Sequence, residues 1–382
     1  MKPQFELGHI LQDHHHYMEQ GTFNPWQKRT LFALSRCRTA AMGGHIDQCD
    51  HLGCSKLHLS YNSCRNRHCP KCQGHQRELW IQKRTAELLP VGYYYLVFTL
   101  PSELNAVALA NPRLIYGTLF KTAWATLQGF AQNPKFLGAT TGMIAVLHTW
   151  GSNMSLHPHL HCIVPGGGIT KKGKWKNAPR VDNFLFPIKQ MSKVFRAKYV
   201  AELRANGIKH KGLFETLFAK DWIVYAKKTF GNANSVIEYL GRYTHKIAIS
   251  NHRIQNISDG AVTFKVKNYK KDGKPELLTL KTKEFIRRFS LHILPKGFVR
   301  IRHFGLLSST SKRLHLDRLL KQLGSPKLKD KTTPLQHLLC PRCKKGRLKT
   351  VYQFDNRGPP KHWLERLKSH KNKDSEKSNA MS

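Results

Sequence analysis

Five of the nine cysteines in this chain of 382 residues fall between positions 49 and 72. A cluster this dense constrains the fold of its segment, because thiols so close in sequence are usually either cross-linked or bound to a metal. The N-terminus, Met-Lys-Pro-Gln-Phe-Glu, lacks the basic-then-apolar pattern of a signal peptide. We therefore expect the chain to stay in the reducing compartment where it is made, a bacterial-type cytoplasm, with metal ligands or free thiols instead of disulfides.

The cluster contains a knuckle, Cys69-Pro-Lys-Cys72, in which a tight turn brings two thiolates to the separation that tetrahedral zinc needs. An upstream pair would close the site. Cys49 and Cys54 are the preferred pair, and Cys64 is a competing ligand. Three nearby histidines are possible substitutes: His51, His68 and His75. The spacing predicts one structural zinc ion, held by four ligands in the N-terminal segment.

The remaining cysteines carry weaker signals. Cys37 and Cys162 suit the interpretation of buried, inert thiols. A second knuckle, Cys340-Pro-Arg-Cys343, lies near the C-terminus but has no obvious complementary pair. It therefore remains a secondary candidate for zinc.

The charge of the chain indicates its partner. Lysine and arginine number 64 against 23 acidic residues, a net charge of +41, while 40% of residues are hydrophobic. This balance excludes an ordinary metabolic enzyme with a small-molecule substrate as the default and favours a folded protein that binds a polyanion. No membrane span is expected, because the strongest apolar run, 91–100, is about half the length that a spanning helix needs. Four cations around the knuckle are candidate phosphate contacts: Arg65, Arg67, Lys71 and Arg77.

Charge and pattern together suggest three segments, 1–90, 91–320 and 321–382. Residues 91–168 carry only three basic and one acidic side chain, so we expect the core there. Strands are predicted over 93–100, 143–150 and 159–164, and the Gly151-Ser152-Asn153 turn favours antiparallel pairing of the last two. With helices predicted between the strands, the fold class is α+β: an antiparallel sheet flanked by helices and preceded by a small zinc-binding domain.

The second strand of that hairpin carries His157-Pro-His159-Leu-His161. Because side chains alternate along a strand, His159 and His161 point the same way and form half of a divalent-metal site. A turn centred near Met154 places His148 opposite His161, where it completes a triad. His157 is the alternative third ligand.

A third motif is Ser235-Val-Ile-Glu238-Tyr239-Leu-Gly-Arg242-Tyr243. Ser235 and Glu238 form a capping box, so a helix is predicted to begin there, with Tyr239 and Tyr243 on one face a turn apart. Such a pair commonly lines a core. A catalytic role requires a metal or base to stabilise the phenolate, because a free tyrosine with pKa near 10 is a poor nucleophile.

These motifs in this order resemble the rolling-circle insertion-sequence transposases of the two-tyrosine class, members of the HUH (His-hydrophobe-His) endonucleases. The resemblance covers about residues 30–310 and rests on five stretches: 61–72, 98–101, 148–151, 157–161 and 239–243. That family usually begins its cysteine cluster with Cys-x-x-Cys; Leu52 breaks this spacing here, and Cys54 stands in.

The resemblance implies a palm-like sheet, a zinc-bearing N-terminal domain, and cleavage of single-stranded DNA at element ends and hairpins. It implies a 5′-phosphotyrosine link to Tyr239 or Tyr243, a Mg²⁺ or Mn²⁺ ion on the three histidines, and DNA contacts that include Arg242. Two alternatives stay open. One is a plasmid-type rolling-circle replication initiator, and the other is a non-catalytic, zinc-dependent DNA-binding protein.

Overall fold

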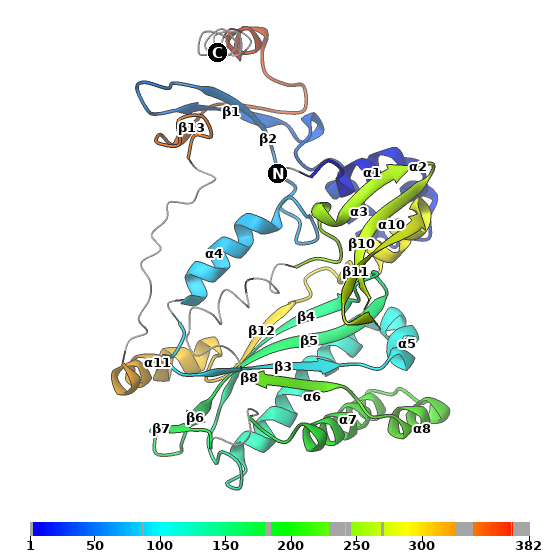
Figure 1. Cartoon of the computed structure of the whole chain (residues 1–382), viewed down its shortest axis with the longest axis vertical. Helices are drawn as coiled ribbons and strands as arrows, with labels where there is room; N and C mark the ends of the chain where they lie inside the picture. The colour runs from blue at the N-terminus through cyan, green and yellow to red at the C-terminus, as the bar shows by residue number, and fades with distance from the viewer. Residues whose placement is uncertain are drawn as a thin grey trace. The chain divides into compact units, whose positions relative to one another are not determined.

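The computed structural model describes residues 3–85, 87–179, 185–228, 241, 246–268, 271–324, 339–367 and 369 (Figure 1). The chain divides into two compact units. The larger unit is built from Met1–Phe5 and Gln73–Lys329, and the smaller from Glu6–Cys72 and Asp330–Ser382. This division differs from the three consecutive segments 1–90, 91–320 and 321–382, because the C-terminal segment joins the N-terminal one in a single sheet.

The larger unit is organised around a five-stranded antiparallel sheet in the order β12-β4-β5-β3-β8. Its strands are β3 (Tyr93–Thr99), β4 (Gly142–Trp150), β5 (Leu156–Pro165), β8 (Val224–Lys228) and β12 (Ile301–Gly305). The hydrophobic strands β3, β4 and β5 form its centre, as expected from their apolar and β-branched sequences. The predicted α+β class and antiparallel hairpin are confirmed.

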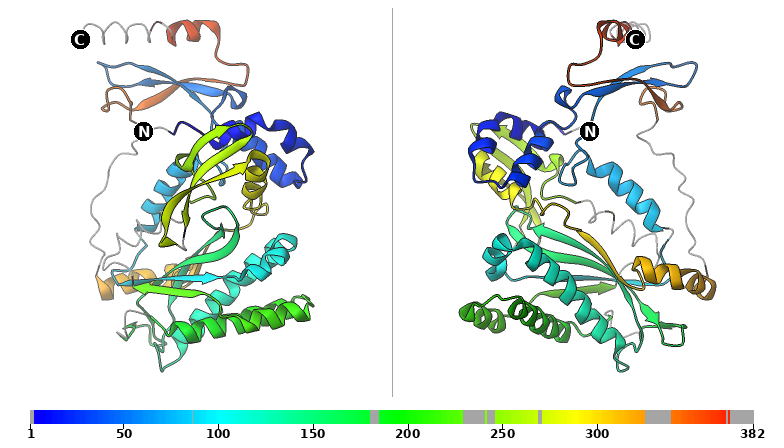
Figure 2. Two further views of the ribbon diagram at one scale, coloured as in Figure 1. Left: turned by 45° about the vertical axis from the view of Figure 1, so that its right-hand side comes forward. Right: turned by 180° about the vertical axis from the view of Figure 1, so that it is seen from behind.

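Two long helices, α6 (Pro112–Gln132) and α7 (Ile188–Ala205), cover one face of this sheet (Figure 2). Pro112 begins α6 directly after α5 (Asn105–Ala110) ends, a position that suits proline because it fixes a helical φ and has no N–H to lose. The main core lies between these helices and the sheet, and includes Phe98, Phe120 and Phe195. The opposite face carries a second, smaller hydrophobic cluster, which includes Ile144 and Ile163, and beside it the polar side chains described below.

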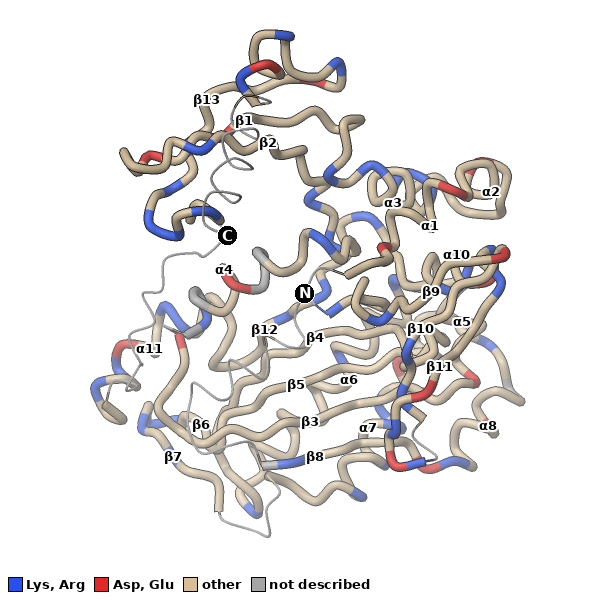
Figure 3. The backbone as a smooth tube through the Cα atoms, turned by 45° about the horizontal axis from the view of Figure 1, so that its top comes forward, with Lys and Arg blue, Asp and Glu red and all other residues tan. Residues whose placement is uncertain are grey.

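Further helices and two small sheets belong to the described part of the larger unit. Four of these helices are α4 (Gln73–Thr85), α5 (Asn105–Ala110), α8 (Lys211–Ala219) and α11 (Ser309–Leu323). A two-stranded sheet pairs β6 (Gly167–Ile169) with β7 (Trp175–Asn177). A three-stranded sheet, order β11-β10-β9, is formed by β9 (Ile254–Ser258), β10 (Ala261–Asn268) and β11 (Lys274–Lys281), with α10 (Thr282–Ser290) packed on it through Phe264 and Phe285. Figure 3, in which lysine and arginine are blue, shows basic residues along β10 and β11.

The smaller unit begins with α1 (Leu7–Asp13), α2 (His15–Gln20) and α3 (Pro25–Ser35). A capping box between Asn24 and Gln27 starts α3. The chain then forms a three-stranded sheet in which β1 (Gly44–Cys49) lies between β2 (Leu57–Tyr61) and the C-terminal strand β13 (Leu348–Phe354). No helix in the described ranges is long and apolar enough to cross a bilayer.

Candidate functional site

The three histidines of the predicted metal site come from the two central strands of the large sheet. His159 and His161 alternate with buried Leu160 on β5, and His148 lies on β4. The expected register was wrong by two residues: His148 pairs with His159, and Val146 pairs with His161. The register also changes at an irregularity between His148 and Trp150, on the turn side of the histidines. Because the error of two residues is even, all three imidazoles still lie on one face.

The side chains converge closely enough to share one ion. The Nε2 atoms of His159 and His161 lie 3.1 Å apart, and the ring centroids of His148 and His161 lie 4.3 Å apart. One ring nitrogen from each of the three histidines falls within 4.8 Å of the other two. His157, the alternative third ligand, is not in this group.

Two neighbours fix the orientation of these rings. The Nδ1 of His159 lies 2.7 Å from the backbone oxygen of His157, and the Nδ1 of His161 contacts the hydroxyl of Tyr95 on β3. If each Nδ1–H donates there, both Nε2 lone pairs are directed toward the shared position. Such second partners set the tautomer and orientation of metal-binding histidines in general.

Burial keeps the imidazoles of His159 and His161 uncharged. It lowers the pKa of His159 to about 4, and it lowers the pKa of His161 well below the usual 6.5, with a contribution from the neighbouring His159. Positive charge on Lys246 lowers both pKa values further. Neutral imidazole is the form that binds a metal, so the site is ready for a cation at neutral pH without first losing protons.

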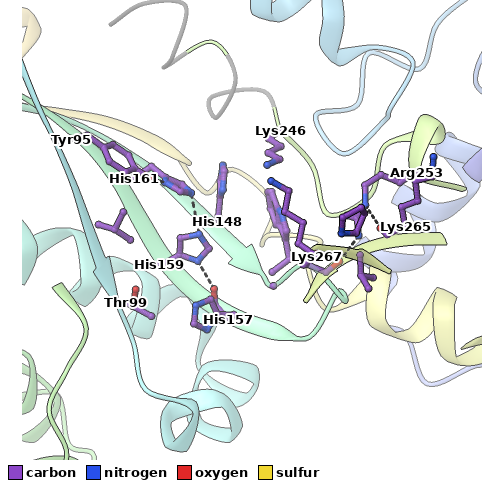
Figure 4. A pocket seen from close by; sticks show the side chains of 16 residues that line it. Tyr95, Thr99, His148, His157, His159, His161, Lys246, Arg253, Lys265 and Lys267 are labelled. Atoms are coloured by element: carbon purple, nitrogen blue, oxygen red, sulfur yellow. Dashed lines mark hydrogen bonds between the residues drawn. The ribbon is translucent and has the colours of Figure 1, made fainter. Parts of the chain in front are cut away.

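The histidines form one wall of a cavity of about 570 Å³, and basic side chains form the wall opposite (Figure 4). Among the described residues that line it, none is acidic and four are cations: Lys246, Arg253, Lys265 and Lys267. A phosphodiester entering this cavity would have imidazoles on one side and ammonium or guanidinium groups on the other. The arrangement suits a metal-assisted reaction at phosphate.

Hydrogen bonds at Ser152 connect the basic wall of the cavity to the histidine hairpin. The side chain of Ser152, in the β4–β5 turn, accepts a hydrogen bond of 2.6 Å from the backbone N–H of Lys267. The backbone oxygen of Ser152 accepts from the guanidinium of Arg253, whose Nε also donates to the oxygen of Lys265 at 2.8 Å. These bonds hold the three-stranded sheet beside the triad.

A second group of metal-type ligands lies in the smaller unit and is formed by Cys37, Cys64, Cys69 and Cys72. The sulfur of Cys37 lies 3.6 Å from that of Cys72 and 3.5 Å from that of Cys69, and those of Cys64 and Cys72 are 3.8 Å apart. A tetrahedron with Zn–S bonds of about 2.3 Å has sulfur–sulfur edges of about 3.8 Å. The four thiols therefore fit a structural zinc ion.

This grouping corrects the predicted ligand set. Cys69 and Cys72 do form a knuckle, but the partners are Cys64 and Cys37, which sequence reasoning took for an inert thiol. Cys49 and Cys54 belong instead to a separate group with Cys340 and Cys343. Cys37 follows the end of α3 and reaches the knuckle through a tertiary contact, which the spacing of cysteines along the chain does not predict.

None of the substitute histidines belongs to either described cysteine group. The ring of His68 lies within hydrogen-bonding distance of the Asn66 side chain, and the side chain of His75 lies outside the described residues, as does that of Arg77. Of the other knuckle cations, Arg65 is exposed and Arg67 is half-buried. Lys71 pairs with Glu6 and donates to the oxygen of Cys37, so it supports the knuckle from inside.

The described residues do not include the tyrosine motif: Tyr239, Arg242 and Tyr243, with the helix predicted from Ser235, lie outside them. In return, the structure adds residues that sequence reasoning missed. The hydroxyl of Tyr95 contacts His161. Tyr95 lies on β3 two residues from Val97, which pairs with His161. This contact cannot be predicted without the register between β3 and β5. The cations of the cavity wall carry no motif in the sequence, and only the fold brings them opposite the histidines.

Comparisons with known proteins agree with this geometry. Residues 142–314 match the sequence model of a family described as "Putative transposase", and residues 10–100 match one described as "Transposase zinc-binding domain". The chain is 39% identical over 369 residues to "Putative transposase y4qJ" of Sinorhizobium fredii, covering 88% of this chain and 92% of the relative. The chain belongs to this transposase family.

A second relative of the transposase is more distant. It is the "Transposase for insertion sequence element IS801" of Pseudomonas savastanoi pv. phaseolicola, 26% identical over 321 residues, which cover 81% of this chain and 77% of the relative. No solved structure matches. The resemblance to rolling-circle insertion-sequence transposases with an N-terminal zinc-binding domain is thus confirmed. The matched zinc-binding domain contains the Cys37 group, and the other match contains the histidine triad.

Proposed function

We propose that this transposase nicks and joins single-stranded DNA at the ends and hairpins of a mobile element, in the bacterial cytoplasm at the nucleoid. The observation that carries the proposal is the triad His148, His159 and His161 facing a wall of lysine and arginine inside one cavity. Affinity for DNA comes from the cations, and the reaction is confined to the phosphate beside the imidazoles.

The three histidines would hold a divalent ion, and all-imidazole ligation suits Mn²⁺ at least as well as the harder Mg²⁺. When bound, such an ion neutralises the charge that develops on the non-bridging phosphate oxygens. Lys246 and Lys267 stand across the cavity, where they can pair with the phosphates on either side.

The nucleophile is one of the two tyrosines of the sequence motif, Tyr239 or Tyr243. Its phenolic oxygen attacks phosphorus and forms a P–O bond, while the bond to the 3′ oxygen breaks. The leaving oxygen takes up a proton and departs as a 3′-hydroxyl. Because the new tyrosyl ester keeps the phosphodiester energy, a 3′-hydroxyl can later reverse the step without ATP. The second tyrosine allows a second cleavage before the first link is resolved.

A plasmid-type replication initiator would use the same histidine strand and tyrosines. The match to a transposase zinc-binding domain ahead of the sheet favours the transposase. A non-catalytic DNA-binding protein would have no use for three converging imidazoles.

The test is a covalent one. Labelled single-stranded oligonucleotides from the element ends are incubated with purified protein and Mn²⁺ or Mg²⁺, and a denaturation-resistant adduct is sought. His159→Ala and His161→Ala should abolish the adduct while leaving oligonucleotide binding nearly intact, because the imidazoles serve the metal and the cations serve affinity. The matched control is His252→Ala, at an exposed histidine of the same unit.

Adduct formation in EDTA, or in the protein that lacks both His159 and His161, would remove the metal from this reaction. No adduct in the parent protein with any metal, despite tight DNA binding, would favour the non-catalytic alternative.

A further inference from the structure

The C-terminal knuckle lies in a segment to which neither family match extends. Those matches cover residues 10–100 and 142–314, whereas the knuckle is Cys340-Pro-Arg-Cys343 and the strand after it is β13. β13 pairs antiparallel with β1, and Cys49, the last residue of β1, lies opposite Leu348, the first of β13. The pairing therefore places the last residue of β1 and the residues just before β13 at the same edge of the sheet.

Two cysteine pairs meet at that edge. The sulfur of Cys49 lies 3.6 Å from that of Cys343, and the sulfur of Cys54 lies 3.8 Å from that of Cys340. All four sulfur atoms fall within 4.8 Å of one another. A disulfide would require about 2.05 Å, and all four thiols are free, but the observed separations match the edges of about 3.8 Å in a tetrahedral zinc–thiolate site.

The backbone around this group is shaped to hold the sulfur atoms. The N–H of Gly346 donates to the sulfur of Cys343 at 3.3 Å, and its oxygen accepts from the N–H of Cys340 at 2.8 Å. A Cβ at Gly346 would lie 2.4 Å from the sulfur of Cys49. Only glycine can therefore occupy this position without displacing a thiol.

Bonds outside the sulfur group join the same two segments. The N–H of Arg347 donates to the carboxylate of Asp50 at 2.7 Å, and the hydroxyl of Thr350 donates to Asp47 at the same distance. The ring of His58, on β2, lies 3.7 Å from the sulfur of Cys340. The four cysteines thus lie where hydrogen bonds join the two segments, and Cys49 and Cys340 are buried.

We propose that this second group of four cysteines binds its own structural zinc ion, which fastens the C-terminal segment to the N-terminal zinc-binding domain. A set of four thiolates selects zinc or iron among the common metals, and a closed site with no free position serves structure instead of catalysis. The ligands are 286 and 294 residues apart in the two close pairs. One ion therefore closes a loop that contains almost the whole larger unit.

The proposal is independent of DNA cleavage and can be tested by metal content. Protein purified without chelator is expected to carry two zinc ions per chain by elemental analysis. Cys340→Ser and Cys343→Ser are each expected to carry one, as is Cys64→Ser, since each removes a ligand from only one group. Cys162→Ala, which removes a buried thiol from the core of the larger unit, is expected to keep two.

Two further measurements guard against misfolding. Cys343→His keeps a zinc-binding side chain and is expected to restore most of the second ion that Cys343→Ser loses. Limited proteolysis of the full-length protein should cut residues 339–367 faster in Cys343→Ser than in the parent, while the protection of β3 to β5 is unchanged.

One zinc per chain in the parent, or two in Cys340→Ser and Cys343→Ser, would overturn the proposal. Iron in place of the second zinc would overturn the choice of metal.

Discussion

The hydroxyl of Tyr95 offers a sharp test of how the histidine triad is held. It contacts the Nδ1 of His161, and both side chains are buried, with 8% and 9% of their surfaces exposed. The ring also stacks on that of His161, with centroids 5.7 Å apart. Tyr95→Phe would keep the stacking and remove only the hydroxyl, so it isolates the bond that orients the imidazole.

Removing a buried partner of a metal-binding histidine typically costs 10- to 100-fold in metal affinity, or about 1.4 to 2.7 kcal/mol. We therefore expect Tyr95→Phe to raise the Mn²⁺ concentration needed for half-maximal adduct formation by that factor. At saturating Mn²⁺ the rate should return close to the parent rate, since the nucleophile and the cationic wall are untouched.

The matched control is Tyr93→Phe. Tyr93 lies two residues away on the same face of β3, and its buried hydroxyl bonds to the backbone of Leu89 instead of a histidine. This change should lower the free energy of unfolding by about 1–3 kcal/mol without moving the Mn²⁺ dependence. An unchanged Mn²⁺ requirement in Tyr95→Phe, or an equal rise in both variants, would refute the view that this hydroxyl orients His161.

Three other outcomes are expected. Tyr239→Phe and Tyr243→Phe should each still form some covalent adduct with a short single-stranded substrate, and the double variant should form none, as measured on a denaturing gel. The prediction is contradicted if mass spectrometry maps every adduct to one tyrosine and Phe at the other tyrosine has no effect. Burial lowers the pKa of His292 to about 4; its unfolded value is higher, so its contribution to the free energy of unfolding is complete above about pH 6.5 and falls, by up to about 3 kcal/mol, as the pH drops toward 4. Urea unfolding at pH 7 and pH 5 should show this loss together with those of His159 and His161, and His292→Gln should make the difference between the two pH values smaller by the share of His292. Gly346→Ala should lower the zinc content by up to one ion per chain, whereas Gly53→Ala, whose added Cβ would lie 3.5 Å from its nearest neighbour, should not; equal zinc in both would argue against a tight sulfur corner.

The three central strands of the large sheet could be predicted from sequence because their signals are local. The strands at β3, β4 and β5 are apolar runs bounded by proline or turn residues, and alternation alone places His159 and His161 on one face. The prediction placed His148 on the correct face of the sheet but opposite the wrong residue, His161 instead of His159. The observed pairing lies two residues from the expected register and contains an irregularity before Trp150, and no local pattern marks either one.

The cysteine partners could not be predicted, for a physical reason. Ligand sets are chosen by tertiary contacts, and spacing along the chain reports only those pairs that one turn brings together. The Cys69–Cys72 knuckle is such a pair, so it was found. Cys37 reaches it from the end of a helix, and Cys340 reaches Cys54 through a strand pairing across 286 residues.

The pairing of β1 with β13 has a consequence for synthesis on the ribosome. The central strand of the smaller sheet is complete at Cys49, but its C-terminal neighbour begins only at Leu348. At about 5–20 residues per second, translation runs for roughly 15–60 s between the two. During that time one edge of β1 has no strand to pair with, so every chain that terminates early leaves the ribosome with an unfinished sheet. Full-length translation is thereby a condition for completing the sheet of the smaller unit.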